Sequence, residues 1–374
     1  MAMSRVKLGD VAVEHKETCK GNKDGYPVVG LEHLTPEEVS LTNWDENNDN
    51  TFTKMFRKGN VLFGRRRAYL KKAAVAPFDG ICSGDITVIE AIPDRVFPDL
   101  LPFIIQNDDL FTYAIGKSAG SLSPRVKWEY LKDYEFELPN MDRQKELSDI
   151  LWAMDTAKKS YQKLIVATDE LVKSQFIDMF GKRDGAIYCT LEECCVSVTG
   201  GSTPSMKHEE YFGGEVPFIK SGDVKADYVS SGALWLTQLA LDETTAKYVP
   251  AGTVVVVTRS GILKHNLPVA ITSNPVVINQ DLKAFEPKPE FSPQYIAWAI
   301  RSREDELLSK TRVMTVDNIE SKDLYEIPVM IASREDQEQF AAFVRQSDKS
   351  KFELEKALSE LTATYKRILA ENLG

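Results

Sequence analysis

Residues 143 to 180 read RQKELSDILWAMDTAKKSYQKLIVATDELVKSQFIDMF and contain neither glycine nor proline. From Leu147 onward, alternating steps of three and four residues meet mostly apolar side chains, which is the spacing of a coiled-coil seam. The seam residues of this stretch are Leu147, Ile150, Met154, Tyr161, Leu164 and Leu171. Gly181 follows directly and suits a helix end. The pattern predicts a helix from about Asp142 to Phe180, roughly 60 Å long at about 1.5 Å per residue.

The same pattern returns 193 residues later, at Phe340. Its seam residues are Phe340, Phe343, Leu354, Leu361 and Ile368, with Ser347 and Ser350 at two further seam positions. The serines indicate either a stretch of weaker packing in the seam or polar residues that fix the register of the paired helices. A lone helix with one apolar stripe is unstable in water, so each helix needs a partner. We expect the two helices to pair with each other as an intramolecular antiparallel coiled coil; the alternative is that each packs on its own globular domain.

The segments before the two helices are repeated in the same order. A turn glycine precedes a strand-like apolar run at Gly59 and again at Gly252, and each run leads into arginine. Short strands and one helical stretch in each segment predict mixed α/β (α+β) domains, related by a pseudo-two-fold axis. The predicted organisation is a first domain at residues 1–140, a spacer helix at 141–182, a second domain at 185–330 and a spacer helix at 333–373.

The composition restricts the function. Of the 374 residues 46 are basic and 56 acidic, a formal charge of -10, which argues against binding nucleic acid over the whole surface. No apolar run approaches the roughly 18 to 20 residues of a membrane span, and the first residues lack a signal-peptide pattern, so we expect a cytoplasmic protein. The five cysteines show no C-x-x-C spacing, and we expect reduced, mostly buried thiols.

Basic residues are nevertheless concentrated locally. Residues 54–72 carry eight basic residues and no acidic one, residues 244–280 also lack Asp and Glu, and residues 116–127 combine small residues, hydroxyls and cations. Such segments suit a phosphate backbone and guanine edges; the alternatives are a solvated face or a turn into a strand. The candidate DNA-binding residues are Arg65, Arg66, Arg67, Lys71, Lys72, Lys117, Ser118, Ser121, Ser123, Arg125, Lys127, Lys220, Arg259, Lys264, His265, Arg312 and Thr315.

Motifs of catalysis are missing from the sequence. It has no G-x-G-x-x-G, no G-x-S-x-G, no N-P-P-[YF] and no histidine pair at metal-ligand spacing. The run Gly116-Lys117-Ser118 is not a P-loop, because Phe111 stands where the first glycine is required. We therefore expect neither catalytic residues nor a metal site.

The order of domain, helix, domain, helix resembles the specificity subunit of type I restriction-modification enzymes. The most diagnostic passage runs from the small-residue loop at Lys117–Ser121 through Leu138-Pro139 to the helix start at Arg143–Leu147. The second copy repeats it with Asn318-Ile319, Ile327-Pro328 and Asp336–Gln339, and the strands ending near Arg66 and Arg259 are also typical.

This resemblance implies two target-recognition domains, each reading one half of a split, asymmetric DNA target, with the helices setting the gap. It implies double-stranded DNA and two modification (methyltransferase) subunits as partners, and leaves restriction and translocase subunits open. S-adenosylmethionine and ATP are then expected on the partner subunits and no cofactor on this non-catalytic chain. The alternative function is a coiled-coil protein-protein adaptor without nucleic acid; a stand-alone enzyme ranks third.

Overall fold

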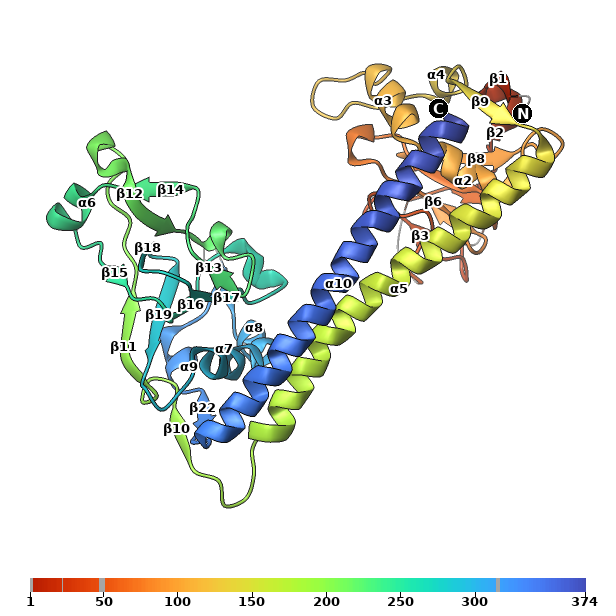
Figure 1. Ribbon diagram of the computed structural model, residues 1–374. Helices are drawn as coiled ribbons and strands as arrows, with labels where there is room; N and C mark the ends of the chain where they lie inside the picture. The colour runs from red at the N-terminus through yellow and green to blue at the C-terminus, as the bar shows by residue number, and fades with distance from the viewer. Residues whose placement is uncertain (1–2, 22, 47–50, 314–316) are drawn as a thin grey trace. The chain divides into compact units, whose positions relative to one another are not determined.

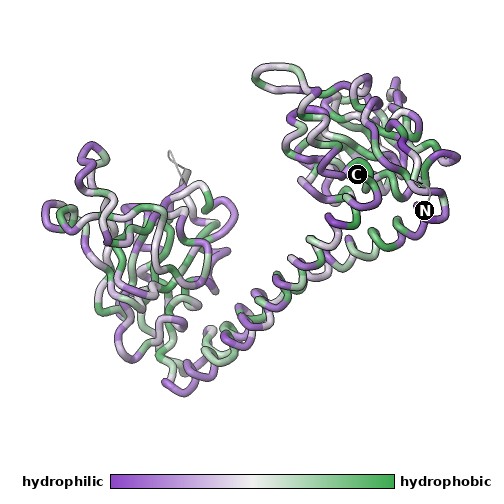
Figure 2. Tube along the Cα trace, turned by 45° about the horizontal axis from the view of Figure 1, so that its top comes forward, coloured by the Kyte–Doolittle hydropathy of each residue, from purple (hydrophilic) through white to green (hydrophobic). Residues whose placement is uncertain are grey.

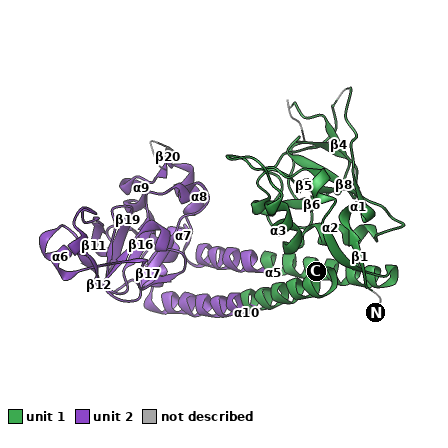
Figure 3. Ribbon diagram, turned by 90° about the horizontal axis from the view of Figure 1, so that it is seen from above, with its two compact units in different colours: residues 1–163, 354–374 green, residues 164–353 purple. Residues whose placement is uncertain are grey.

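A computed structural model describes residues 3–21, 23–46, 51–313 and 317–374 (Figure 1). Its chain forms two units: Met1–Lys163 together with Leu354–Gly374, and Leu164–Glu353 (Figure 3). In the described part of the chain, none of the helices is long and apolar enough to cross a membrane.

The first unit is built on two small sheets. A four-stranded antiparallel sheet has the order β2-β8-β5-β6, and a three-stranded sheet has the order β3-β7-β4, with β3 and β7 parallel. Strands β1 and β9 form an antiparallel pair beside them. The strands are β1 Met3–Lys7, β2 Ala12–Glu14, β3 Val28–Val29, β4 Lys54–Phe56, β5 Val61–Gly64, β6 Ala73–Val75, β7 Gly80–Cys82, β8 Ile86–Ala91 and β9 Glu135–Pro139. The short helices are α1 Leu8–Val11, α2 Leu101–Ile105, α3 Asp108–Gly116 and α4 Trp128–Leu131.

The second unit repeats this plan with additions. Its larger sheets have the orders β11-β19-β16-β17-β13 and β14-β12-β18-β15, and β10 pairs with β22 and β20 with β21. The strands are β10 Tyr188–Thr190, β11 Cys195–Gly200, β12 Phe212–Ile219, β13 Tyr228–Val229, β14 Leu234–Leu236, β15 Tyr248–Val249, β16 Val254–Val257, β17 Val269–Thr272, β18 Val276–Ile278, β19 Leu282–Pro287, β20 Arg312–Val313, β21 Asp317–Asn318 and β22 Pro328–Met330. The short helices are α6 Gln238–Glu243, α7 Pro293–Arg301, α8 Glu304–Ser309 and α9 Ser321–Tyr325.

The two plans match strand by strand. The order β2-β8-β5-β6 corresponds to β11-β19-β16-β17, and β3-β7-β4 corresponds to β12-β18-β15, including the parallel pair in each. Gly59 and Gly252 both have a positive φ, 88° and 80°, and each stands two positions before the first residue of the equivalent strands β5 and β16. A residue with a Cβ is strained in that conformation, which explains the repeated turn glycine. The prediction of two similar mixed α/β domains is confirmed.

Strands β5 and β16 are buried along their whole length, which explains why they read as continuous apolar runs. In the second unit, β16 shares one hydrophobic core with helix α7 and with residues of both long helices. The long helices are therefore part of each unit's core.

These long helices are α5, Met141–Phe180, and α10, Arg334–Leu373, each of 40 residues (Figure 1). In the first unit Leu147, near the start of α5, shares a core with Leu373 at the end of α10. In the second unit Phe176, near the end of α5, packs edge-on against Phe340, near the start of α10, with ring centroids 5.2 Å apart. The helices are thus antiparallel within each unit. Polar and apolar residues alternate along both, as expected for a half-buried helix (Figure 2).

Most residues of the predicted seam are buried or half-buried, but three predicted positions on α5 are exposed. Leu147 and Phe340 are fully buried, and Met154, Tyr161, Phe343, Leu354, Leu361 and Ile368 are half-buried. Ile150, Leu164 and Leu171 are exposed, and the buried positions there are Leu151 and Val172. The physical reason is that the ends of each helix also pack on a globular domain. The buried face of α5 therefore includes the residue after the predicted one, on the side that faces the domain. The two long helices therefore both pair with each other and pack on the globular domains.

The expectation of five reduced thiols is wrong for one pair. Cys189 and Cys194 form a disulfide, while Cys82 and Cys195 are buried free thiols. The tight turn between them, in which Cys194 N donates to Thr190 O at 3.1 Å, brings the two side chains together. Cys189 and Cys194 are separated by four residues, so neither the adjacent nor the C-x-x-C spacing indicates their pairing.

Candidate nucleic-acid interface

The end of strand β5 positions the three consecutive arginines of the first unit. Arg65 N donates to Asp85 O at 3.0 Å, and Val126 N donates to Arg65 O at 3.0 Å. Arg67 N donates to Pro124 O at 2.8 Å. These backbone bonds bring together three segments that are distant in the sequence: Arg65–Arg67, the β7–β8 turn with Asp85, and the loop of residues 117–127. We call this cluster the N-terminal arginine corner.

One carboxylate organises the charges of this corner. Asp85 Oδ1 accepts from Arg125 Nε at 2.7 Å, and Asp85 Oδ2 lies 3.3 Å from Arg125 Nη2 and 3.4 Å from Arg66 Nη1. The bond from Arg125, supported by the charge of Arg66, holds the pKa of Asp85 below its usual range. Arg66 Nη2 also donates to Ser123 Oγ at 3.0 Å. Two guanidinium groups share one carboxylate, so these three side chains keep a net positive charge.

Asp85 was not among the predicted site residues. The repeat contains a signal for it, because Asp85 directly precedes β8 and Asp281 directly precedes the equivalent strand β19. Asp85 is acidic, so a prediction built on clustered basic residues does not include it.

The second unit has an equivalent C-terminal arginine corner, formed by Thr258–Ser260, Asp281 and Asp317–Ile319. Thr258 N donates to Asp281 O at 2.8 Å, Ile319 N to Thr258 O at 2.9 Å, and Ser260 N to Asp317 O at 3.1 Å. Each of these bonds corresponds to one in the first unit. The backbones of Arg259 and Asn318 pair as those of Arg66 and Arg125 do.

The remaining candidates of the first unit divide into two groups. Lys117 lies over the Tyr113 ring at 5.6 Å, and Ser118 Oγ donates to Ala114 O, so both are at the base of the loop. Ser121 and Lys127 are exposed on it. Lys71 and Lys72 are directed elsewhere: Lys71 Nζ pairs with Asp108 at 2.5 Å, which raises its pKa, and Lys72 Nζ donates to Leu31 O at 2.7 Å. The structure does not bring these two lysines into the corner.

In the second unit, Lys264 lies beside the corner, with Nζ 4.0 Å from the Asp317 carboxylate, and His265 is exposed next to it. Lys220 follows β12, and its backbone N donates to Asp223 Oδ2. Arg312 begins strand β20, whose backbone pairs with that of Asn318. Thr315 lies outside the described residues.

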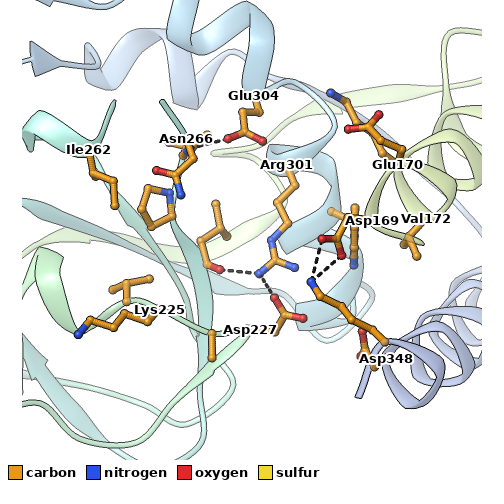
Figure 4. A pocket seen from close by; sticks show the side chains of 18 residues that line it. Asp169, Glu170, Val172, Lys225, Asp227, Ile262, Asn266, Arg301, Glu304 and Asp348 are labelled. Carbon is orange, nitrogen blue, oxygen red and sulfur yellow. Dashed lines mark hydrogen bonds and ion pairs between the residues drawn. The ribbon is translucent and has the colours of Figure 1, made fainter. Parts of the chain in front are cut away.

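A pocket of about 470 Å³ in the second unit offers a different kind of site (Figure 4). Five acidic and four basic side chains line it, and several already pair with each other. Arg301 Nη2 contacts Asp227 at 2.6 Å, and Lys351 contacts Asp169 at 2.8 Å. Among the described residues no group of three or more His, Cys, Asp or Glu side chains is arranged to hold a metal ion. The Lys351–Asp169 pair joins α10 to α5, and the Arg301–Asp227 pair joins α7 to the segment before β13, so both have a structural role.

Comparison with known proteins supports the repeat. The family model described as the type I restriction modification DNA specificity domain matches residues 3–166 and 188–362. The curated type I restriction enzyme EcoR124I/EcoR124II specificity subunit of Escherichia coli is 30% identical over 152 residues, which are 40% of this chain and 38% of that protein. The match thus spans about two fifths of that relative's length.

Two solved structures share the fold. One comes from work on complex assembly and conformational transition of the type I R-M system, with a TM-score of 0.63, 18% identity and coverage of 99% of this chain and 97% of the other. The other is the type I restriction-modification system S subunit from M. genitalium, with a TM-score of 0.52, 14% identity and coverage of 99% and 95%. At these identities the likeness concerns the fold alone.

Proposed function

The chain belongs to the type I restriction modification DNA specificity family, and we propose that its two globular units each read one half of a split, asymmetric DNA target. The observation that carries this proposal is the repeated arginine corner. In both units a fully buried strand ends in a cation-bearing segment that is pinned by the same three backbone hydrogen bonds. A rigid element that aims arginine at a surface suits base and phosphate recognition.

The two corners differ in their side chains. Arg125 in the first corner is replaced by Asn318 in the second, and the position of Ser123 is taken in the sequence by Val316. Arginine favours guanine and asparagine favours adenine in the major groove. Two different readers in one chain support an asymmetric target.

The helices α5 and α10 would set the gap between the half-sites and dock two modification (methyltransferase) subunits. Each helix is continuous over 40 residues and starts in one unit and ends in the other, which supports a fixed spacer. Exposed apolar side chains on α5, such as Leu164 and Leu171, remain for a partner to cover. In this proposal the chain itself is non-catalytic. S-adenosylmethionine would be bound by the modification subunits and ATP by a restriction and translocase subunit.

Sequencing of methylated adenines in cells with and without this gene tests the proposal. The expected result is that one split motif, with two defined halves and an unspecified gap of fixed length, loses methylation when the gene is deleted and regains it on complementation. Deletion without loss of any split motif in cells that carry the partner subunits would contradict it.

A further inference from the structure

Leu122 is the most exposed large hydrophobic side chain in the part of the chain that the structure describes, at 90% exposure. Single exposed apolar residues are common on protein surfaces and need no explanation by themselves. Leu122 differs in its position, because it stands at the tip of the loop that forms one side of the N-terminal arginine corner.

The backbone holds this tip in place. Ala119 and Arg125 exchange two backbone hydrogen bonds, of 3.0 and 2.9 Å, and so close residues 119–125 into a hairpin. Gly120 has a φ of +118°, a conformation that favours glycine. The hairpin is tied to the corner by the Arg67 N to Pro124 O bond and by the Arg66 to Ser123 bond. Leu122 is therefore exposed at the tip of a loop whose base is held by backbone and side-chain hydrogen bonds.

The groups around Leu122 indicate the chemistry of the partner. Ser121 and Ser123 flank it in the sequence, and the guanidinium groups of Arg66 and Arg125 lie at the base of the same hairpin. An apolar tip between hydroxyls and cations fits a polyanion that also presents apolar groups. Side chains that enter the major groove of DNA meet the base edges, whose apolar group is the C5 methyl of thymine.

We propose that Leu122 is a specificity-determining residue that contacts the C5 methyl group of a thymine in the half-site read by the first unit. This inference rests on the proposed function. In the 193-residue repeat the equivalent position is Thr315, so the second half-site is read by a different side chain.

Replacing thymine by uracil tests the contact, because it removes only the C5 methyl group. Once the methylated motif is known, the full chain in complex with its modification subunits is titrated with duplexes that carry a single uracil at each thymine of either strand in that half-site. The proteins compared are the wild type, Leu122→Ala, Leu122→Met and, as a matched control, Ile187→Ala, which truncates another exposed apolar side chain, in the second unit.

The wild-type complex should lose affinity about four-fold at one thymine, as expected for one buried methyl-sized group. Leu122→Ala should bind thymine DNA weaker by a similar factor and be indifferent to uracil at that position. Leu122→Met, which keeps an apolar tip, and Ile187→Ala should retain the sensitivity.

The proposal is overturned if the half-site contains no thymine, if the wild type is insensitive to uracil at every thymine, or if Leu122→Ala is as sensitive as the wild type. A wild-type complex that binds no specific DNA contradicts the proposed function itself and is thereby distinguished from failure of the Leu122 contact alone.

Discussion

Gln144 and Gln337, 193 residues apart in the sequence, make the same buried contact in the two halves of the chain. The side-chain oxygen of Gln144 accepts from Phe97 N at 2.8 Å, and that of Gln337 accepts from Ser292 N at 2.8 Å. Both glutamines lie in the first turns of a long helix, and each ties its helix to the domain that precedes it. The repeat therefore extends from strand order to individual hydrogen bonds.

Removing either glutamine should destabilise its unit. The amide of Gln144 also donates to Pro139 O, and that of Gln337 to Glu290 O and Ala332 O. Substitution by alanine leaves these buried backbone groups unpaired, at a cost of about 1 to 3 kcal/mol. Urea unfolding followed by circular dichroism measures this loss. Gln346→Ala, an exposed position on α10, is the control; equal stability of Gln337→Ala and Gln346→Ala would contradict the assignment.

Asp85→Asn should raise non-specific affinity for DNA. The substitution removes the only negative charge among the Asp85, Arg66 and Arg125 side chains, so their net charge rises by one. One additional phosphate contact would steepen the dependence of log affinity on log salt by about 0.9. Fluorescence titrations of a non-target duplex over a range of salt concentrations measure this slope. Asp79→Asn, which breaks an ion pair with Arg57, is the control, and an unchanged slope for Asp85→Asn would count against the corner.

The same carboxylate predicts a pH dependence. The pKa of Asp85 is lowered by its bond to Arg125, so the ionised group is stabilised in the folded protein. Its contribution to stability is present above the unfolded pKa of about 3.9 and is lost as the pH falls through the lower folded value. The stability difference between wild type and Asp85→Asn, on the order of 1 kcal/mol at pH 7, should shrink below about pH 4. Thermal unfolding at several pH values checks this, and a difference that grows on acidification has the wrong sign.

Arg66→Ala and Arg259→Ala should each weaken recognition of one half-site. If each arginine makes a bidentate contact to a base, its loss costs about 1 to 3 kcal/mol and relaxes the preference at that position alone. Binding of the assembled complex to duplexes mutated in one half or the other measures the effect. Arg95→Ala, an exposed arginine outside the corner, is the control. A uniform loss over all sequences would instead make the residue a phosphate contact.

The sequence predicts those parts of the fold that depend on regular spacing of residues along the chain. Apolar spacing located both long helices, and the ordered repeat located two similar domains. The one-residue displacement of the buried face, from Ile150 to Leu151 and from Leu171 to Val172, could not be read this way. This displacement depends on where each domain packs against its helix. That contact joins residues that are distant in the sequence, so the local spacing does not show it.

The candidate site was predictable to a similar degree. The arginines after β5 and β16 stand where a strand was expected to aim them. Lys71 belonged to an acid-free window, but Asp108, 37 residues away in the sequence, pairs with it. Local charge counts do not detect such a partner. Asp85 is not predicted from the sequence because its role depends on folding. Its carboxylate pairs with Arg66 and Arg125, which are distant from it in the sequence.

In the proposed function, one chain reads two half-sites at a fixed distance. The most direct measurement is binding of the assembled complex to its target with the gap intact and with one base pair inserted. An inserted base pair shifts one half-site by about 3.4 Å and rotates it by about 35° relative to the other. Specific binding should fall toward the affinity of either half-site alone. Unchanged affinity for the lengthened target would contradict it.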